Sequence, residues 1–103
     1  MRVRRSAEAA KDVEEVVKYY SRQDLSLANR FIRKYEASLR IIKEMPGTGS
    51  LRFANQLDIP DVRAYPMQDF PYIVFYRAHK DAIDIDRVLH SHRDTFSILL
   101  GYQ

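Results

Sequence analysis

The sequence predicts a single α+β domain in which two antiparallel helices pack on a mostly antiparallel sheet. Apolar residues recur at helical spacing through the first 45 residues, a break with proline and glycine follows, and residues 62–90 contain three strand-like runs. With 103 residues, 46% of them hydrophobic, the chain suffices for one core. The expected order is an N-terminal edge strand, an αα-hairpin, a three-stranded antiparallel meander and a short C-terminal segment.

The first element is a short segment around Val3, which arginines flank on both sides. Basic side chains often protect the open edge of a sheet, so we expect an edge strand. Ser6 follows as a helix N-cap, and Glu8 in the first turn suits the helix dipole. The apolar face of this helix comprises Ala9, Val13, Val16, Val17 and Tyr20. Its polar residues, expected to face away from the core, are Lys11, Asp12, Glu14, Glu15 and Lys18.

The second helix completes the hairpin. Residues 21–23 are expected to connect the two helices, and Asp24 to cap the second one. The helix should end near Pro46, because the residue before a proline avoids helical geometry. Its apolar stripe comprises Ala28, Phe31, Ile32, Tyr35, Leu39, Ile42 and Met45. A short turn between two long helices predicts an αα-hairpin.

An irregular segment is expected from Pro46 to about Asp61, held to the core by its apolar residues. These are Leu51, Phe53, Leu57 and Ile59. Strands should then occupy residues 62–67, 72–78 and 82–90, and their short connections predict a meander.

The last strand alternates between apolar and polar residues. One face should carry Ile83, Ile85 and Leu89, and the other Asp84, Asp86 and His90. This alternation predicts a sheet with one packed face and one wet face. Arg87 breaks the pattern, since strict alternation places it on the packed face. We therefore expect a bulge there, or a guanidinium that is paired or reaches out to solvent.

Composition narrows the classes of function. The chain has no cysteine, which excludes disulfides, thiol catalysis and cysteine-based zinc sites and fits a reducing cytoplasm. No apolar stretch is long enough for a membrane span or a signal sequence, so we expect a cytoplasmic protein. Residues 1–45 carry a net charge of +4 and residues 46–103 a net charge of −1. The expected sheet thus lacks a basic stripe, which argues against direct binding of nucleic acid there.

Several short motifs are spread along most of the chain. They are Asp12-Val13-X-X-Val16-X-X-Tyr19, Ala28-X-X-Phe31, Pro46-Gly47, Arg52, Arg63 and Tyr72-X-Val74-X-Tyr76. The most specific motif lies in residues 83–94, which end in Arg87-Val88-Leu89-His90, two further residues, and Arg93-Asp94. Together these motifs resemble those of ParE-like toxins in the ParE/RelE superfamily; the helical matches are weak individually, whereas the final motif is specific.

This resemblance implies a RelE-like fold and the toxin component of a type II toxin–antitoxin system, of the sort often labelled plasmid stabilisation proteins. Such toxins are neutralised by a cognate antitoxin, here ParD-like, through which they also oligomerise. The ParE branch is associated with inhibition of DNA gyrase, and the RelE branch with cleavage of mRNA on the ribosome. Because fold does not decide between these activities, the residues of the site must.

RNA cleavage at a 2′-hydroxyl requires a base, an acid and cations around the phosphate. The resemblance to RelE-like nucleases places the two lysines of the second strand near Ala64 and Pro66. The third-strand arginine falls at or beside Ile73 and the late tyrosine near Leu99, so Arg93 alone matches. Arginine stays protonated and cannot shuttle protons. We therefore expect no catalytic residues and no cofactor, and a protein that acts by binding.

Two other interpretations of the sequence stay open. His90 and His92, with Tyr102, could replace the missing acid and base and give a ribosome-dependent mRNA endonuclease. In the simpler alternative, His90 orients the chain end by a hydrogen bond and His92 is solvated. A metal site would need ligands beyond this pair, such as His79 or Asp94. The chain could also be a non-toxic relative that only binds its partner.

Eight residues are candidate contacts to the target or the antitoxin. They are Arg63, His90, His92, Arg93, Phe96, Leu99, Leu100 and Tyr102. Arg63 could instead bridge to Asp84 or Asp86 as an ordinary surface ion pair. The apolar tail could instead cover an open sheet edge.

Overall fold

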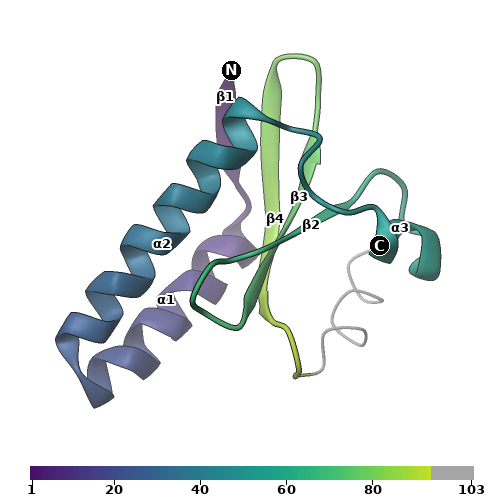
Figure 1. The fold of residues 1–103 in the computed structure, drawn as a ribbon. Helices are drawn as coiled ribbons and strands as arrows, with labels where there is room; N and C mark the ends of the chain where they lie inside the picture. Colours follow the sequence, from purple (N-terminus) through teal and green to yellow (C-terminus); the bar gives the residue numbers. More distant parts are fainter. Residues whose placement is uncertain (94–103) are drawn as a thin grey trace.

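The computed structural model describes residues 1–93 of the chain. Its elements follow the predicted order, with one short helix added (Figure 1). They are β1 (Arg2–Arg5), α1 (Ala7–Gln23), α2 (Leu25–Glu44), α3 (Arg52–Leu57), β2 (Arg63–Pro66), β3 (Tyr72–Ala78) and β4 (Ala82–His90). The predicted α+β class and the αα-hairpin are confirmed.

The four strands form one sheet in the order β1-β4-β3-β2. Strands β2, β3 and β4 make the predicted antiparallel meander. Strand β1 lies at the edge as expected, but it pairs with β4 in parallel, from Arg2 opposite Ala82 to Arg5 opposite Ile85. The sheet is therefore mixed, and its first and last strands are neighbours.

Helix boundaries follow the predicted caps. The Ser6 side chain accepts a hydrogen bond from the Ala9 N–H at 2.9 Å, and Asp24 caps α2 by accepting from the Ser26 N–H at 2.9 Å. Because α1 continues to Gln23, the connection between the helices is Asp24 alone, shorter than the three residues expected. Met45 is 58% exposed and lies outside the apolar stripe to which the sequence assigned it.

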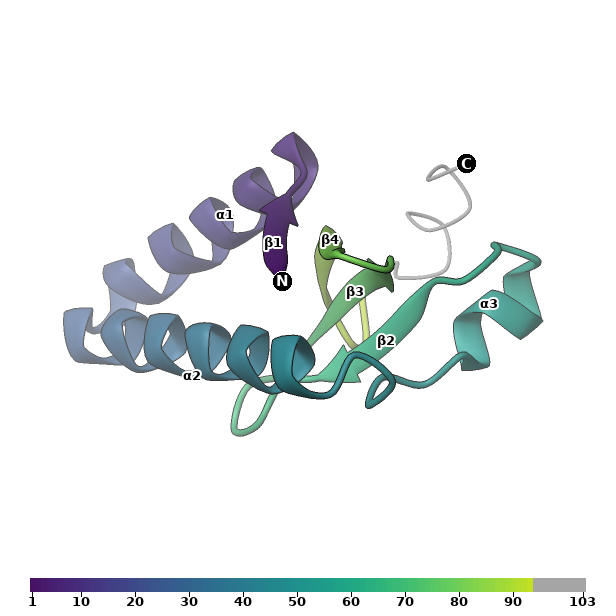
Figure 2. The same ribbon diagram turned by 90° about the horizontal axis from the view of Figure 1, so that it is seen from above.

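Helices cover both faces of the sheet (Figure 2). The α1–α2 hairpin packs on one face around a core that includes Phe31, Ile42, Tyr76, Ile83 and Ile85. On the other face, α3 and the residues after it cover a second core. This second core comprises Phe53, Ala54, Ile59, Val62, Ala64, Ile73, Phe75 and Leu89. The expectation of a single wet face is therefore wrong for the half of the sheet beneath α3.

The segment expected to be irregular contains α3. Its Phe53 and Ala54 are buried, and Asp58 ends it in the left-handed conformation with φ 54°. A helix of six residues is too short to show a 3.6-residue apolar repeat, which is why periodicity did not predict it.

A bulge in β4 explains the Arg87 anomaly. Phe75 lies opposite Arg87 while the next residue, Tyr76, lies opposite Ile85, so Asp86 is the extra residue. The insertion reverses the alternation that follows it. Val88 consequently joins Ile83 in the helix-facing core, and Leu89 lies in the opposite one. The predicted bulge is confirmed, whereas the expected placement of Leu89 beside Ile83 is wrong.

Within residues 1–93, none of the helices combines the length and the apolar character that a membrane crossing requires.

Candidate functional site

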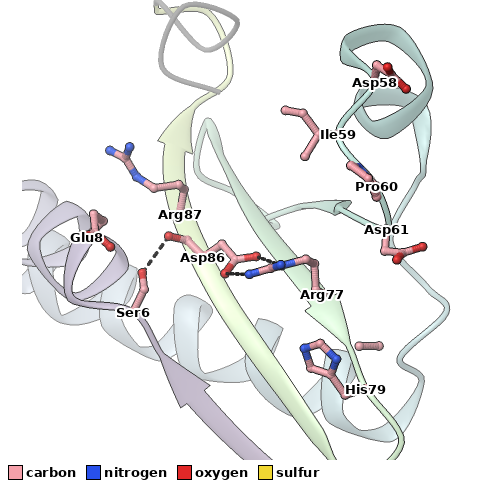
Figure 3. A pocket seen from close by; sticks show the side chains of 11 residues that line it. Ser6, Glu8, Asp58, Ile59, Pro60, Asp61, Arg77, His79, Asp86 and Arg87 are labelled. Atoms are coloured by element: carbon pink, nitrogen blue, oxygen red, sulfur yellow. Dashed lines mark hydrogen bonds and ion pairs between the residues drawn. The ribbon is translucent and has the colours of Figure 1, made fainter. Parts of the chain in front are cut away.

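An open cleft of about 910 Å³ lies on the sheet face opposite the helical hairpin (Figure 3). One wall is the start of α1, and the other is the turn that follows α3. Strands β3 and β4 form the floor between them. The lining residues are Ser6, Glu8, Asp58, Ile59, Pro60, Asp61, Arg77, Ala78, His79, Asp86 and Arg87.

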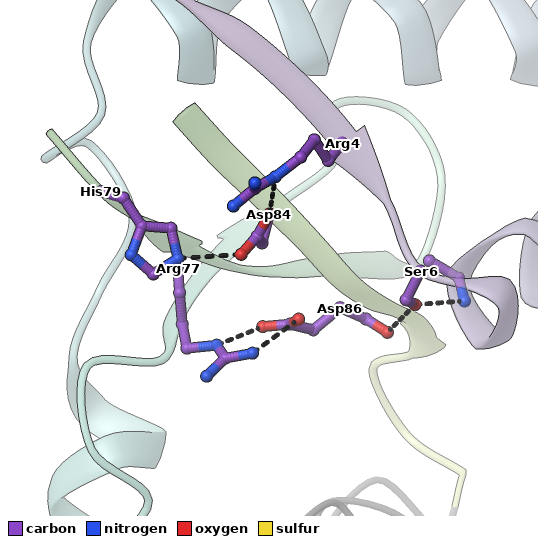
Figure 4. Close-up of polar contacts among 7 residues, drawn as sticks. Arg4, Ser6, Arg77, His79, Asp84 and Asp86 are labelled. Atoms are coloured by element: carbon purple, nitrogen blue, oxygen red, sulfur yellow. Dashed lines mark hydrogen bonds and ion pairs between the residues drawn. The ribbon is translucent and has the colours of Figure 1, made fainter. Parts of the chain in front are cut away.

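The bulge residue Asp86 sets the charge of the cleft floor. Its carboxylate accepts hydrogen bonds from Arg77 Nε at 2.9 Å and Arg77 Nη2 at 3.2 Å, and its side chain is 7% exposed. The Asp86 carbonyl accepts from the Ser6 hydroxyl at 2.8 Å, which joins the start of α1 to the bulge (Figure 4). A buried carboxylate needs such a partner, so Arg77 neutralises the floor.

Beside this pair, Asp84 connects β1 to the β3–β4 turn. It accepts from Arg4 Nε at 2.6 Å, and its other oxygen lies 2.8 Å from His79 Nε2 (Figure 4). The hydrogen bond from Arg4, followed by the contact with His79, lowers the pKa of Asp84 below its ordinary value. The sequence indicated neither partner, because Arg4 lies on a strand whose parallel pairing only the fold reveals.

A second groove, of about 370 Å³, runs along β4 beyond the end of β1. There Asp12 of α1 takes the place of a neighbouring strand. Its carboxylate accepts from Arg87 Nε and Nη2, each at 2.8 Å, and from the Val88 N–H at 3.0 Å. The expected pairing of Arg87 is thus confirmed. Asp12, expected to face solvent, is instead turned toward the sheet edge, and its hydrogen bonds raise the pKa of Arg87.

Three candidate residues come together where β4 ends. The His92 N–H donates to His90 Nδ1 at 3.1 Å, and the two imidazole centroids lie 6.0 Å apart. Arg93 Nη2 donates to the Tyr72 hydroxyl at 3.4 Å, and the Tyr72 ring lies edge-on to His90 at 5.3 Å. Burial, aided by Arg93 and His92, lowers the pKa of His90. The hydrogen bond to His90 Nδ1 holds the backbone at His92 against the end of β4, while His92 is exposed.

Arg63 lies elsewhere, on the edge strand β2. Its guanidinium donates to the Gly49 carbonyl at 2.8 Å and to the Gly47 carbonyl at 3.3 Å. The ion pair to Asp84 or Asp86 considered from sequence is wrong, because those carboxylates bind other partners. Arg63 therefore fixes the loop between α2 and α3.

The four apolar candidates Phe96, Leu99, Leu100 and Tyr102 lie outside the described residues, as does Asp94. Within residues 1–93, no three histidine, aspartate or glutamate side chains gather as a metal ion would require.

Comparison with known proteins places this geometry in a family. The family model described as "ParE toxin of type II toxin-antitoxin system, parDE" matches residues 3–95. Among solved structures, a chain of the "Chromosomal ParDE TA system from P. aeruginosa" superposes with a TM-score of 0.72 at 18% identity, covering 87% of this chain and 95% of that one. Among curated proteins, none matches. The family model spans β1 to the end of β4, including the site residues of this sheet, and the chain therefore belongs to the ParE toxins of type II toxin–antitoxin systems.

Proposed function

We propose that this toxin acts by binding protein rather than by catalysis, that DNA gyrase is its target, and that a ParD-like antitoxin neutralises it. The family supplies the toxin–antitoxin context, and its parDE designation implies an antitoxin partner. Gyrase is the target associated with the ParE branch. The proposal places the toxin in the cytoplasm, where gyrase acts on the chromosome.

The observation that supports binding over RNA cleavage is the second hydrophobic core. Of the positions that carry catalytic cations in RelE-like nucleases, one falls near Ala64 and another at or beside Ile73; these two residues are 4% and 8% exposed and pack in that core beneath α3. A lysine or arginine there would bring a charge into an apolar contact, at a cost of several kcal/mol in a fully apolar setting. Burial of these two residues supports binding over RNA cleavage.

The two arginines of the cleft floor have anionic partners. Arg77 pairs with Asp86, and Arg87 pairs with Asp12. The groove beside His90 also contains the acidic Glu15. Asp12 and Glu15 balance Arg87 and Arg93 in this groove, so it carries no excess of positive charge for RNA, which supports binding of a protein surface.

A supercoiling assay with purified gyrase and antitoxin-free toxin tests the target. We expect inhibition at micromolar toxin, relieved by the cognate antitoxin. His92→Glu and Arg93→Glu, at the exposed end of β4, should weaken inhibition at least tenfold, as expected for loss of about 1.4 kcal/mol of binding. Lys11→Glu, on the solvent side of α1, is the matched control, because it changes the charge by the same amount as Arg93→Glu. Absence of inhibition at micromolar toxin would exclude gyrase but not a toxin with another target.

One observation favours a second candidate, a ribosome-dependent mRNA endonuclease. His90 and Arg93 contact Tyr72, His92 lies beside His90, and an imidazole pair could move protons. Mapping of transcript ends after brief expression separates the two functions. Cuts in phase with codons, abolished by His92→Ala, would support the nuclease. Intact mRNA together with induction of the DNA-damage response would support gyrase.

A further inference from the structure

The sheet face opposite the helical hairpin is left open between α1 and the turn after α3, where the cleft of about 910 Å³ lies (Figure 3). Three acidic side chains stand on the walls of this cleft, and all three are exposed. Glu8 belongs to the first turn of α1, whereas Asp58 and Asp61 belong to the turn after α3. Within residues 1–93, the side chains of Glu8 and Asp61 make no hydrogen bond or ion pair.

The lining of the cleft has a charge opposite in sign to that of the whole chain. Four acids and two arginines line it, which gives −2 when histidine is counted as neutral, whereas the whole chain carries +3. Each arginine also has a carboxylate partner, since Arg77 binds Asp86 at 2.9 Å and Arg87 binds Asp12 at 2.8 Å. Because these pairs match the charges of the arginines, the excess of negative charge comes from the acids on the walls.

The wall that carries Asp58 and Asp61 has a fixed backbone. Both residues are in the left-handed conformation, with φ of 54° and 65°, which aspartate adopts more readily than most residues do. The neighbouring Ile59 and Val62 are 3% and 0% exposed and pack in the second core. The Ile59 N–H also donates to the Ala54 carbonyl at 3.2 Å. A wall anchored in this way loses little conformational freedom when a ligand binds, which favours affinity.

We propose that this cleft binds a basic segment of the protein that the toxin inhibits, with lysine or arginine side chains of that segment between the two acidic walls. The inference rests on the proposed function, because it requires a protein target. Proteins that handle DNA carry such side chains where they contact phosphates, so a negatively charged cleft complements a surface that a target of this kind offers. The exposed Pro60 and Ala78 can contact the aliphatic stems of these side chains.

Other occupants fit the cleft less well. RNA and DNA carry the same sign of charge as the walls. A bare metal ion needs several ligands, and within residues 1–93 no three candidate ligands gather. A second copy of the chain offers the arginines of β1, but Arg4 already binds Asp84 at 2.6 Å, and a head-to-tail contact of this kind does not close into a dimer. A basic segment of a partner protein meets none of these objections.

The first test is an NMR titration of the full chain, labelled with ¹⁵N, with a synthetic hexapeptide of alternating arginine and serine. A few exposed ion pairs give weak binding, so we expect a Kd on the order of 0.1–1 mM at low salt. Saturable shifts should appear at Glu8, at residues 58–61 and at residues 77–79. A peptide of alternating glutamate and serine should produce no saturable shifts there.

Isosteric variants assign the binding to the acidic walls. The triple variant Glu8→Gln, Asp58→Asn and Asp61→Asn removes three charges and keeps the size of each side chain, and asparagine tolerates the left-handed backbone of the turn. We expect this variant to bind the basic peptide about tenfold more weakly, with a difference that shrinks as salt is added. Circular dichroism melts verify that it is folded.

A matched control removes the same charge outside the cleft, through Glu14→Gln, Glu36→Gln and Glu44→Gln. Its Kd for the basic peptide should change by less than about twofold, because these positions do not line the cleft. A difference between the two triple variants therefore reports the cleft rather than the total charge of the protein.

The supercoiling assay separates this inference from the choice of target. If the wild-type toxin inhibits gyrase, the cleft variant should require about five- to tenfold more protein for the same inhibition, and the control variant no more than about twofold. Wild-type inhibition that the cleft variant retains in full would overturn the cleft inference and leave gyrase as the target. Saturable binding of the basic peptide in the cleft of a toxin that does not inhibit gyrase would support the cleft and exclude gyrase.

Three results of the NMR work would also overturn the inference. One is the absence of saturable shifts at the cleft with about 5 mM basic peptide, well above the expected Kd. Another is equal weakening of peptide binding by the cleft variant and the control variant. The third is occupation of the cleft by the chain itself, seen either as self-association that the cleft variant abolishes or as nuclear Overhauser contacts between the cleft and residues 94–103 in the free toxin.

Discussion

Replacement of Asp12 by alanine removes the acceptor of three hydrogen bonds at once. Two come from the Arg87 guanidinium at 2.8 Å each, and the third comes from the Val88 N–H at 3.0 Å. The variant leaves a largely enclosed cation and a strand-edge amide without their partner. We therefore expect a substantial loss of stability from a residue on the polar side of α1.

The magnitude follows from the degree of enclosure. Breaking a fully buried ion pair costs about 3–5 kcal/mol, and an exposed pair contributes about 0–1 kcal/mol. The side chains of Arg87 and Asp12 are 21% and 12% exposed, so water still reaches the pair and the upper range does not apply. Including the Val88 amide, we expect Asp12→Ala to cost about 2–3 kcal/mol. For a domain of this size, that corresponds to a fall in Tm of roughly 10–20 °C.

Urea denaturation followed by circular dichroism measures this cost, and a double-mutant cycle with Arg87→Met isolates the ion pair. The coupling energy should be about 1–2 kcal/mol, with the remainder assigned to the Val88 amide. Glu14→Ala is the control. Its pair with Lys18 is more than 60% exposed on both sides, so a change below about 0.5 kcal/mol is expected. An Asp12→Ala cost as small as this control, or strictly additive costs in the cycle, would refute the reasoning.

Three further predictions concern the loop and the polar network. A Cβ at Gly49 would lie 2.7 Å from the Tyr76 hydroxyl, so Gly49→Ala should cost about 1–3 kcal/mol, whereas Gly47→Ala, with nothing within 4 Å, should change the Tm little. Tyr76→Phe removes a hydroxyl that accepts from the Gly49 N–H at 2.8 Å and donates to a loop carbonyl, and thermal melts should show a cost of about 1–2 kcal/mol. The pKa of Asp84 is lowered in the folded state, first by Arg4, so its contribution to stability is complete above its unfolded pKa and is lost as pH falls. Asp84→Asn should therefore flatten the loss of stability between about pH 5 and about pH 3, and an unchanged slope would contradict this assignment.

Local sequence patterns predicted the helices and strands well, because the residues that set their boundaries lie within or next to each element. Ser6 and Asp24 each cap the helix that directly follows them, and Pro46 ends α2 for a steric reason in the same turn. The misfit of Arg87 in an otherwise alternating strand correctly indicated a bulge. The short helix α3 was missed because its six residues contain less than two turns of apolar repeat.

Features of the site that depend on distant residues could not be predicted. The partners Asp12 and Arg87 are 75 positions apart in the chain, and the motif that begins at Asp12 does not indicate which residue its carboxylate contacts. The second core required knowledge of where α3 lies. The prediction that Leu89 shares a sheet face with Ile83 was wrong. The sequence pattern indicated a bulge near Arg87, but it did not indicate that the residues after the bulge lie on the opposite faces of the sheet.

Parallel pairing of β1 with β4 joins residues about 80 positions apart, as Arg4 and Asp84 illustrate. Since the ribosome makes β1 first and β4 last, the helical hairpin can form early, but the sheet can close only when nearly the whole chain has been synthesised. Non-local closure of this kind slows folding and leaves an incomplete chain without its native surface. A nascent or truncated toxin would therefore lack the assembled sheet that the proposed binding requires, and under that proposal toxicity would begin only after the sheet has closed.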